Sequence, residues 1–234
     1  GMSDDGTQAK IQSLPGAERV RVIPNPERIQ AAGLNKAIGQ AKGEIIIRVD
    51  GHTVIAPDYV RQCVQALTTL DADNVGGPMN PVGLTPMGKA IAAAGKSPFA
   101  VPTAFHVSQQ AQYTDTVYMG AWRREVFDRV GSYDETFKIN EDYELNYRIR
   151  KAGGKIYFTP DIQSEYYGRQ TLSALAKQYF RYGVGKTKTL RAHPASLKLR
   201  HLVAPVFVLG LVVGGLLSMV SRLAMLCWFS GIAA

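Results

Sequence analysis

An acidic residue and a histidine stand two positions apart at the end of a short apolar run, in the sequence Asp50-Gly51-His52. A carboxylate and an imidazole this close together can hold a hard divalent cation, and the cation can bridge a diphosphate. Mg²⁺ or Mn²⁺ suits such a pair, and the imidazole favours Mn²⁺. The simpler alternative is a tight turn, because Asp-Gly is a common turn pair. Asp50 and His52 are therefore candidate metal ligands, and the alternative is that Asp50 and Gly51 only form a turn.

Two further carboxylates, Glu141 and Asp142, follow Asn140 at the predicted start of a helix. A carboxylate in that place can act as a general base on a hydroxyl group. The alternative is that acidic residues in a first turn complement the helix dipole, with Asn140 as the helix N-cap. Glu141 and Asp142 are candidate catalytic residues on this evidence.

Gln178, Arg181 and Tyr182 are three and four residues apart, so they share one face of a predicted helix. Arginine can grip a phosphate with two parallel hydrogen bonds. The alternative is a basic helix that touches anionic lipids. Near the start, a polar turn at Ser3-Asp4-Asp5-Gly6-Thr7 can contact a nucleotide base or ribose, or it is simply a loop.

The elements that must position these residues alternate along the first part of the chain. Apolar spacing and turn signals predict helices over 7–14, 29–41 and 57–70, and strands over 19–23, 44–49 and 75–78. Alternating strands and helices favour an α/β sheet with parallel strands. Ligands of such sheets bind beyond the carboxyl ends of the strands, and Asp50 stands at such an end.

The second part of the chain is less regular. The stretch 79–111 is rich in Gly, Pro and Ala and is not assigned to an element. Beyond it, the pattern predicts strands over 117–121 and 155–159, and helices over 123–129, 140–152 and 172–190.

Composition and charge narrow the class of protein. Apolar residues make up 46% of the 234 residues and charged residues 20%, the balance of a protein with a packed core. Two cysteines in very different surroundings suggest neither disulfides nor a cysteine metal site. Residues 1–165 carry 18 basic and 19 acidic residues, whereas nine basic and no acidic residues follow. A nucleic-acid-binding protein more often carries its basic residues across the folded domain, so no nucleic-acid partner is expected.

The basic tail precedes an uncharged run of nineteen residues, 202–220, which is long enough to cross a bilayer as a helix. Basic residues flanking such a run face the cytoplasm. We therefore expect a cytoplasmic domain over 1–190, a basic juxtamembrane segment over 191–201 and a transmembrane region over 202–234, with one span and the start of a second. Both ends of the sequence are expected to be cut points, because the start is polar and turn-like and the last apolar stretch is too short to span.

Taken together and in order, these segments resemble glycosyltransferase family 2. Residues 3–7 are similar to the end of that family's DDGSxDGT turn, and residues 43–50 are similar to GEYIxFLD, which leads into its metal-binding DxD motif. Asn35 stands where the family has the asparagine of ARNxG. Residues 119–127 resemble GAFRREVF, residues 130–142 resemble VGGFDE…ED, and residues 178–182 resemble QxxRW.

The resemblance implies a GT-A fold, which is an α/β nucleotide-sugar transferase fold with a Rossmann-like mixed sheet, here without its first strand. It implies an inverting transfer from a nucleotide-diphosphate sugar, a UDP-hexose, to a lipid-linked or polysaccharide acceptor. The implied metal ligands are Asp50 and His52, and Asp142 is the implied base, with Glu141 beside it. The implied donor-binding residues are Asp5, Asn35, Asp50, Gln178, Arg181 and Tyr182.

Within the family, the start at residues 1–7 and the segment 48–53 resemble bacterial exopolysaccharide enzymes of the succinoglycan type. This implies a bacterial inner membrane location with the catalytic domain in the cytoplasm. Two departures from the family pattern are that His52 replaces the second Asp of the metal motif and Tyr182 replaces Trp. The competing hypotheses are a nucleotidyltransferase, whose Gly-rich phosphate loop is not seen, and a catalytically inactive membrane-associated scaffold that binds nucleotide or lipid.

Overall fold

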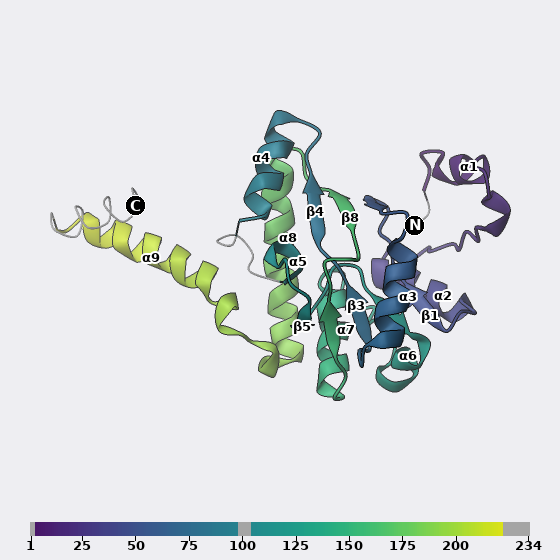
Figure 1. The fold of residues 1–234 in the computed structure, drawn as a ribbon. Coiled ribbons are helices and arrows are strands. Elements are labelled where there is room, and N and C mark those ends of the chain that lie inside the picture. Colours follow the sequence, from purple (N-terminus) through teal and green to yellow (C-terminus); the bar gives the residue numbers. More distant parts are fainter. Residues whose placement is uncertain (1–2, 98–103, 222–234) are drawn as a thin grey trace. The chain divides into compact units, whose positions relative to one another are not determined.

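A computed structural model of the protein describes residues 3–97 and 104–221 (Figure 1). The chain divides into two compact units, Gly1–Thr189 and Leu190–Ala234, and the boundary falls in the last turn of one long helix. The first unit contains every candidate site residue named above. Its helices are α1 (Thr7–Gln12), the 3₁₀ helix η1 (Ala17–Arg19), α2 (Gln30–Gln40), α3 (Tyr59–Thr69), α4 (Pro86–Gly95), α5 (Ala104–Val107), α6 (Arg124–Val130), α7 (Glu141–Lys151) and α8 (Leu172–Ala192).

A five-stranded sheet forms the centre of the first unit, with the strand order β1-β6-β3-β7-β5. Its strands are β1 (Ile45–Ile47), β3 (Asn74–Gly76), β5 (Gln112–Thr114), β6 (Ala121–Arg123) and β7 (Ile156–Phe158). β3 and β7 pair in parallel, whereas β6 runs antiparallel to both β1 and β3. The parallel sheet predicted from the order of elements is therefore corrected to a mixed one, because β6 lies between β1 and β3 and runs antiparallel to both. The mixed sheet that the family resemblance implied is confirmed. The α/β class itself is confirmed.

A second sheet of three strands has the order β2-β8-β4. It consists of β2 (Thr53–Ile55), β4 (Met79–Val82) and β8 (Ser164–Tyr167), with β8 antiparallel to β2 and parallel to β4. β2 begins three residues after Asp50, and Tyr166 of β8 is the register partner of Thr53. This sheet therefore brings the second half of the chain to the predicted metal segment.

Hydrophobic side chains bury both faces of the five-stranded sheet. Neighbouring residues of a strand point to opposite faces, and on β6 Trp122 belongs to one buried cluster while Ala121 belongs to the other. The first cluster includes residues of α2, α6 and α7, such as Leu145 and Ile149. The second includes Tyr59, Cys63 and Leu67 of α3. The sheet is thus sandwiched between helices, and its strand ends are held firmly.

The predicted strand over 19–23 is wrong. Ala17–Arg19 forms the 3₁₀ helix η1, and the residues after it adopt no regular structure. Val20 and Val22 are 53% and 42% exposed, and this segment pairs with neither sheet among the described residues. Alternation of apolar residues predicts a strand only where a partner strand and a face to bury exist. The strand predicted over 117–121 is also displaced, because β6 covers Ala121–Arg123.

Gly77 follows β3 at a point where the backbones of two segments nearly touch. A Cβ atom at this position would lie 1.8 Å from the carbonyl oxygen of Ile162. We expect Gly77→Ala to destabilise the protein by about 3 kcal/mol or more, because backbone must move to admit the methyl group. Urea denaturation measures this, with Gly39→Ala as the matched control. Gly39 lies in α2 with nothing within 4 Å of its Cβ direction, so its replacement should stabilise by roughly 0.5–1 kcal/mol. Equal effects at the two positions would contradict this packing.

The second unit contains two short 3₁₀ helices, η2 (Pro194–Ser196) and η3 (Leu199–His201), and the apolar helix α9 (Val203–Ser218). α9 is 16 residues long and thus shorter than the predicted run over 202–220. No helix within residues 3–97 and 104–221 has both the length and the hydropathy to cross a bilayer. The predicted second apolar stretch, 223–234, lies outside the described residues.

Candidate active site

Asp50 lies three residues beyond β1, and its carboxylate is held by Arg48. The two side chains point to the same side because they are two residues apart in extended chain. Arg48 Nε donates to Asp50 Oδ1 at 2.7 Å, and Nη2 donates to Oδ2 at 3.2 Å. The side chains of Arg48 and Asp50 are only 7% and 13% exposed. Burial by itself would lower the pKa of the Arg48 guanidinium, but the hydrogen bonds to Asp50 and the neighbouring negative charges raise it, so Arg48 is a fixed cation.

Arg48 also reaches the start of α7, which is more than 90 residues away in sequence. Its Nη2 lies 3.5 Å from Glu141 Oε1, and Glu141 is only 5% exposed. Burial first, and then the adjacent charge of Asp142, raise the pKa of the Glu141 carboxyl to about 7, although the positive charge of Arg48 opposes the rise. The guanidinium therefore joins the end of β1 to Glu141, one of the two carboxylates predicted to be catalytic.

Asp142 differs from Glu141 in its surroundings. It is half-buried, and its Oδ1 accepts a hydrogen bond of 2.7 Å from the backbone amide of Tyr143. Asn140, directly before the helix, has a left-handed backbone with φ of 63° and makes no side-chain cap, so its predicted capping bond is absent. Asp142 Oδ2 has no hydrogen-bond partner among the described residues. Asp142 therefore presents a carboxylate oxygen to its surroundings, whereas Glu141 is enclosed.

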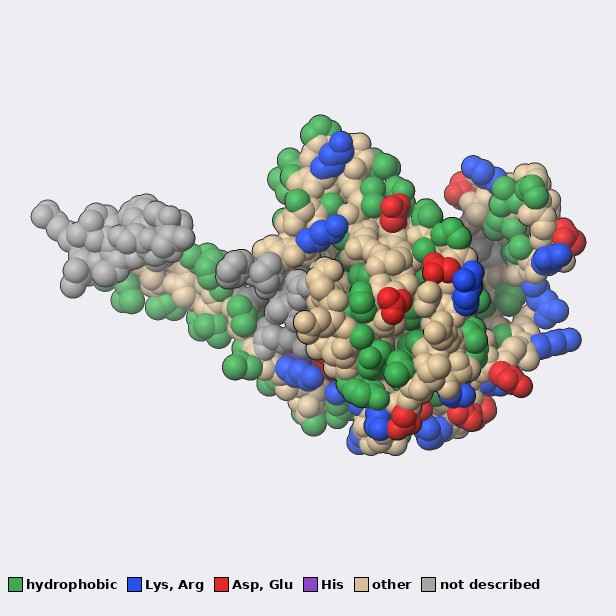
Figure 2. Space-filling view, in the orientation of Figure 1, with side chains coloured by type: hydrophobic (Ala, Val, Ile, Leu, Met, Phe, Trp, Pro, Cys, Tyr) green, Lys and Arg blue, Asp and Glu red, His purple; other side chains and the backbone are tan. Residues whose placement is uncertain are grey.

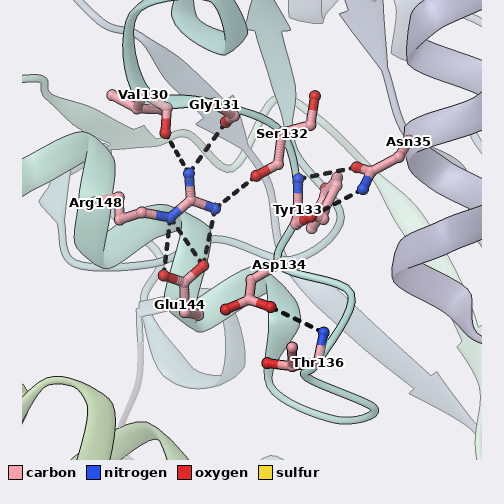
Figure 3. A network of polar contacts seen from close by, with 9 residues as sticks. All are labelled: Asn35, Val130, Gly131, Ser132, Tyr133, Asp134, Thr136, Glu144 and Arg148. Atoms are coloured by element: carbon pink, nitrogen blue, oxygen red, sulfur yellow. Dashed lines mark hydrogen bonds and ion pairs between the residues drawn. The ribbon is translucent and has the colours of Figure 1, made fainter.

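The loop after α6 is fixed by a polar network that also positions Tyr133 (Figure 3). Arg148 of α7 pairs with Glu144 and donates to the carbonyl oxygens of Val130, Gly131 and Ser132. Burial raises the pKa of the Tyr133 hydroxyl while the positive charge of Arg48 opposes that rise. The network thus anchors a loop whose tyrosine borders the central guanidinium.

Asn35 of α2 completes this network (Figure 3). Its Nδ2 donates to the carbonyl oxygen of Tyr133 at 2.8 Å and to Glu135 Oε1 at 2.9 Å, and its Oδ1 accepts from the Tyr133 amide at 2.9 Å. Both donor hydrogens of the amide are therefore used within the protein. In this structure Asn35 joins α2 to the loop, and its predicted contact with a donor stays a prediction.

A cluster of aromatic and polar side chains links His52 to α8. The rings of His52 and Tyr166 meet edge to face with centroids 5.0 Å apart, and Tyr118 contacts Tyr166 in the same way at 5.9 Å. Gln178 Nε2 donates to the Tyr182 hydroxyl at 2.6 Å and to the Tyr166 hydroxyl at 3.4 Å. Three predicted site residues, His52, Gln178 and Tyr182, are thus brought together by Tyr166 of β8.

Two lysines hold α8 against α7 and against the segment that leads into it. The Lys186 ammonium lies 3.5 Å from the centre of the Tyr143 ring, and Lys188 lies 4.5 Å from the centre of the Phe137 ring. Lys188 also donates to the carbonyl oxygen of Thr136. Tyr182 lies on the same helix as these lysines. Burial is the main cause of the raised pKa of the Tyr182 hydroxyl, and the negative charge of Asp142 contributes to the rise.

The other predicted site residues lie apart from these contacts. Arg181 is exposed and bonds to neither Gln178 nor Tyr182. Asp5 is exposed, and its Oδ1 accepts from the amide and hydroxyl of Thr7 at 3.1 and 2.6 Å. Within residues 3–97 and 104–221, the hydrogen bonds of the Asp5 side chain go to Thr7 and not to any other predicted site residue. The predicted roles of Arg181 and Asp5 remain predictions.

Sequence reasoning missed Arg48 and Arg169. Arg48 was visible as a charged residue two positions before Asp50 in an otherwise apolar run, a spacing that puts both on one side of an extended chain. Arg169 donates to Gln178 Oε1 at 3.3 Å. No local pattern distinguished Arg169 from the other basic residues of the tail, because its contact depends on how β8 leads into α8.

Asp50 has the chemistry to hold a divalent cation that substrate phosphates complete. Each of its oxygens accepts one bond from Arg48 and keeps a further lone pair. Mg²⁺ is commonly bound by one or two carboxylates together with water and phosphate oxygens. In the described part of the chain, no three His, Cys, Asp or Glu residues gather into a ready-made metal cluster. The residues present therefore fit a cation shared with a diphosphate, for which Asp50 and His52 would be the protein ligands.

The raised pKa of Glu141 predicts a pH-dependent stability. Between the ordinary glutamate pKa of about 4.3 and about 7, the folded state holds a proton that the unfolded state has lost. Stability therefore falls as the pH rises through this window. We expect the protein to lose roughly 2–3 kcal/mol between pH 5 and pH 8 relative to Glu141→Gln, measured by urea denaturation at each pH. The exposed residue Glu125, changed to Gln, is the control and should leave the slope intact. A Glu141→Gln variant with the unchanged slope would contradict the assigned protonation.

Comparisons with known proteins agree with this geometry. Residues 2–185 match the family described as "Glycosyltransferase like family 2". The chain is 35% identical over 228 residues to the succinoglycan biosynthesis protein ExoA of Rhizobium meliloti (strain 1021), an alignment that covers 96% of this chain and 69% of that protein. It is 24% identical over 200 residues to the dolichyl N-acetyl-alpha-D-glucosaminyl phosphate 3-beta-D-2,3-diacetamido-2,3-dideoxy-beta-D-glucuronosyltransferase of Methanococcus voltae, covering 82% of this chain and 62% of that protein.

The fold also resembles a solved structure, that of GalNAc-T7 with UDP, GalNAc and Mn²⁺. The TM-score is 0.53 at 17% sequence identity, and the match covers 71% of this chain and 35% of the other. At this identity the likeness concerns the fold alone. The chain spans about a third of that solved chain and somewhat over two thirds of the Rhizobium relative.

Proposed function

The chain belongs to glycosyltransferase family 2, and we propose that it transfers a hexose from a UDP-linked donor to a hydroxyl of a lipid-linked or polysaccharide acceptor, with inversion at the anomeric carbon. The observation that carries this proposal is that the buried Arg48 pairs with both Asp50 and Glu141, the residue directly before Asp142. Such a transfer requires a carboxylate that holds the cation shared with the diphosphate and a second carboxylate that acts as the base.

Asp142 is the proposed base. It removes the proton from the acceptor hydroxyl while that oxygen attacks the anomeric carbon, and the bond to the diphosphate breaks with its electron pair leaving on the diphosphate. The hydroxyl pKa is far above 7, so proton removal must accompany attack rather than precede it. Asp142 suits this role better than the enclosed Glu141, because its carboxylate is partly exposed and its Oδ2 accepts no hydrogen bond from the described residues. Glu141 would help to position Asp142 through Arg48.

The donor is proposed to lie across Asp50, His52 and the tyrosine cluster. When bound at Asp50 and His52, Mn²⁺ or Mg²⁺ would offset the negative charge of the leaving diphosphate. Gln178 and Tyr182 would line the donor or acceptor channel, since Tyr166 already joins them to His52. Arg181, Asn35 and Asp5 are proposed as further donor contacts on the family resemblance.

The proposed setting is exopolysaccharide or cell-surface glycan synthesis at the inner membrane of a bacterium. The Rhizobium relative is named for succinoglycan biosynthesis, and the Methanococcus relative is named as a transferase that acts on a dolichyl-linked sugar. The basic run followed by an uncharged run over 202–220 supports a membrane anchor with the catalytic unit on the cytoplasmic side.

The test is sugar release or transfer from a panel of UDP- and GDP-sugars, with membranes that carry the protein. Activity with one donor should fall at least a hundredfold when EDTA removes divalent cations, and Mn²⁺ or Mg²⁺ should restore it. Turnover that survives EDTA would remove the metal from the proposal. Binding of UDP without turnover of any donor would favour the inactive nucleotide-binding scaffold instead.

A further inference from the structure

A hollow of about 320 Å³ lies between the end of β4 and one face of α4. Its lining consists of Pro81, Gly83, Lys89, Ala92, Ala93 and Lys96. The four residues at 89, 92, 93 and 96 have the spacing of one helix face, so two ammonium groups flank a floor of alanine methyl groups. Hollows of this size with an apolar lining and a few charged groups are typical of small-ligand sites.

The hollow carries the positive charges of Lys89 and Lys96, and no acidic residue near them in the sequence neutralises these charges. No acidic residue occurs between Asp73 and Asp115. Neither Lys89 nor Lys96 forms a salt bridge with any described residue. Lysine binds phosphate groups as a compact point charge. The hollow therefore has the chemistry for a phosphate that carries an aliphatic chain.

The surface beside the hollow is apolar as well. Leu84, which directly follows Gly83 in the wall of the hollow, is 69% exposed. Basic and hydrophobic side chains gather over α4 in the space-filling view (Figure 2). Exposed apolar residues next to a positive hollow continue the path that an aliphatic chain would take.

The hollow lies on the same side of the three-stranded sheet as the tyrosine cluster. Pro81 is the register partner of Tyr166 in the parallel pair of β4 and β8, so the two side chains point to the same face. Tyr166 contacts the ring of His52 and accepts a hydrogen bond from Gln178. The backbones of Pro81, in the wall of the hollow, and of Tyr166, in the tyrosine cluster, are therefore one strand spacing of about 4.8 Å apart.

A second connection runs through the loop before α8. Gln170 Oε1 accepts from the backbone amides of Leu84 and Thr85, at 2.8 and 3.2 Å, and so holds the start of α4. Its neighbour Arg169 donates to Gln178. The start of α4 and the polar side chains of the active site are thus fastened to the same short loop.

We propose that this hollow binds the phosphate and first aliphatic carbons of the lipid-linked acceptor, with Lys89 and Lys96 on the phosphate. The inference rests on the proposed function, because it names the acceptor class of that same site. The phosphate would anchor the lipid beside Tyr166 and direct the sugar that it carries toward Asp142.

The test measures binding of farnesyl monophosphate to the full-length protein in detergent, compared with the double variant Lys89→Ala/Lys96→Ala. We expect the affinity to fall at least tenfold in this variant. Lys42→Ala/Lys151→Ala is the matched control, since it removes two exposed lysines outside the hollow and should leave the affinity unchanged. Far-UV circular dichroism and thermal melting establish that both variants are folded.

Three comparison ligands decide what the hollow recognises. Farnesol and inorganic phosphate should each bind at least tenfold more weakly than farnesyl monophosphate, because each offers half of the chemistry. Equal binding of inorganic phosphate, or of dihexanoyl phosphatidylglycerol, would overturn the acceptor assignment in favour of a general anion or headgroup site. Unchanged farnesyl monophosphate binding in the double variant would overturn the inference outright. Absence of sugar transfer from every donor would instead overturn the proposed function, and this binding measurement can be made without any turnover.

Discussion

Replacing Asp142 by Asn should reduce sugar transfer by about 10²–10⁴-fold while the protein still binds the nucleotide donor. The amide is nearly the same size as the carboxylate and can still accept a hydrogen bond from the Tyr143 amide, so local structure is kept. It cannot accept the proton of the acceptor hydroxyl. The loss should therefore appear in kcat and leave the donor KM nearly unchanged, as measured with the active donor at saturating metal.

Asp128→Asn is the matched control for this experiment, because Asp128 is an exposed residue of α6 in the same unit. It should retain full activity. If Asp142→Asn kept more than half of the wild-type kcat, Asp142 would not be the base, and Glu141→Gln would become the variant to examine. Loss of UDP binding in Asp142→Asn would instead assign this residue to the donor.

Replacing Arg48 by Met should destabilise the folded state by about 3–5 kcal/mol, the range for removing one partner of a buried ion pair. Arg48 is 8% exposed and lies between the carboxylates of Asp50 and Glu141. Without the guanidinium, buried negative charges face one another with no cation between them. The deficit should shrink as the solution is made acidic, because protonated carboxyl groups no longer repel. Urea denaturation at pH 5 and pH 8 measures both effects.

Arg19→Met provides the contrast for Arg48→Met. The side chains of Arg19 and Glu18 are 89% and 73% exposed and 3.7 Å apart, and exposed pairs of this kind contribute about 0–1 kcal/mol. Arg48→Lys should recover only part of the stability, because an ammonium cannot donate two parallel hydrogen bonds to Asp50. If Arg48→Met unfolded at the same urea concentration as Arg19→Met, the site would not depend on its central cation.

Local sequence patterns predicted the helices well. The observed bounds of α2, α3 and α8 fall within two residues of the predicted ranges 29–41, 57–70 and 172–190. Helical spacing, a proline near the start and glycine near the end are local signals, so a single sequence displays them. The strand over 155–159 was predicted for the same reason, as a short apolar run that β7 now occupies.

Pairing between distant segments was not visible in the sequence. β2 and β8 are only three and four residues long, which is too short for a pattern of alternation to stand out in the sequence. Nothing local indicated that Thr53 and Tyr166 would be register partners. The predicted strand over 19–23 was wrong for the opposite reason. Its apolar residues alternate as in a strand, but no other strand pairs with it among the described residues.

The candidate site shows the same division. The resemblance identified Asp50, Glu141 and Asp142, and in the structure one guanidinium pairs with Asp50 and with Glu141, the neighbour of Asp142. Sequence alone did not reveal that Arg48 would join them, because the contact between Arg48 and Glu141 requires β1 and α7 to be packed in place. The different roles proposed for Glu141 and Asp142 likewise depend on how deeply each side chain is buried. Two adjacent acidic residues in a sequence do not show which of them is buried.

The pairing of β4 with β8 has a consequence for the synthesis of the protein. Met79 pairs with Ser164 in a parallel register, so the three-stranded sheet cannot close until the residues of β8 have left the ribosome. At about 5–20 residues per second, β4 must wait several seconds to more than ten seconds for its partner. During this interval the edges of β2 and β4 are unpaired, and such edges favour aggregation. The sheet that completes the active site should therefore be among the last parts of the nascent chain to fold, and its closure should respond strongly to chaperones and to the speed of translation.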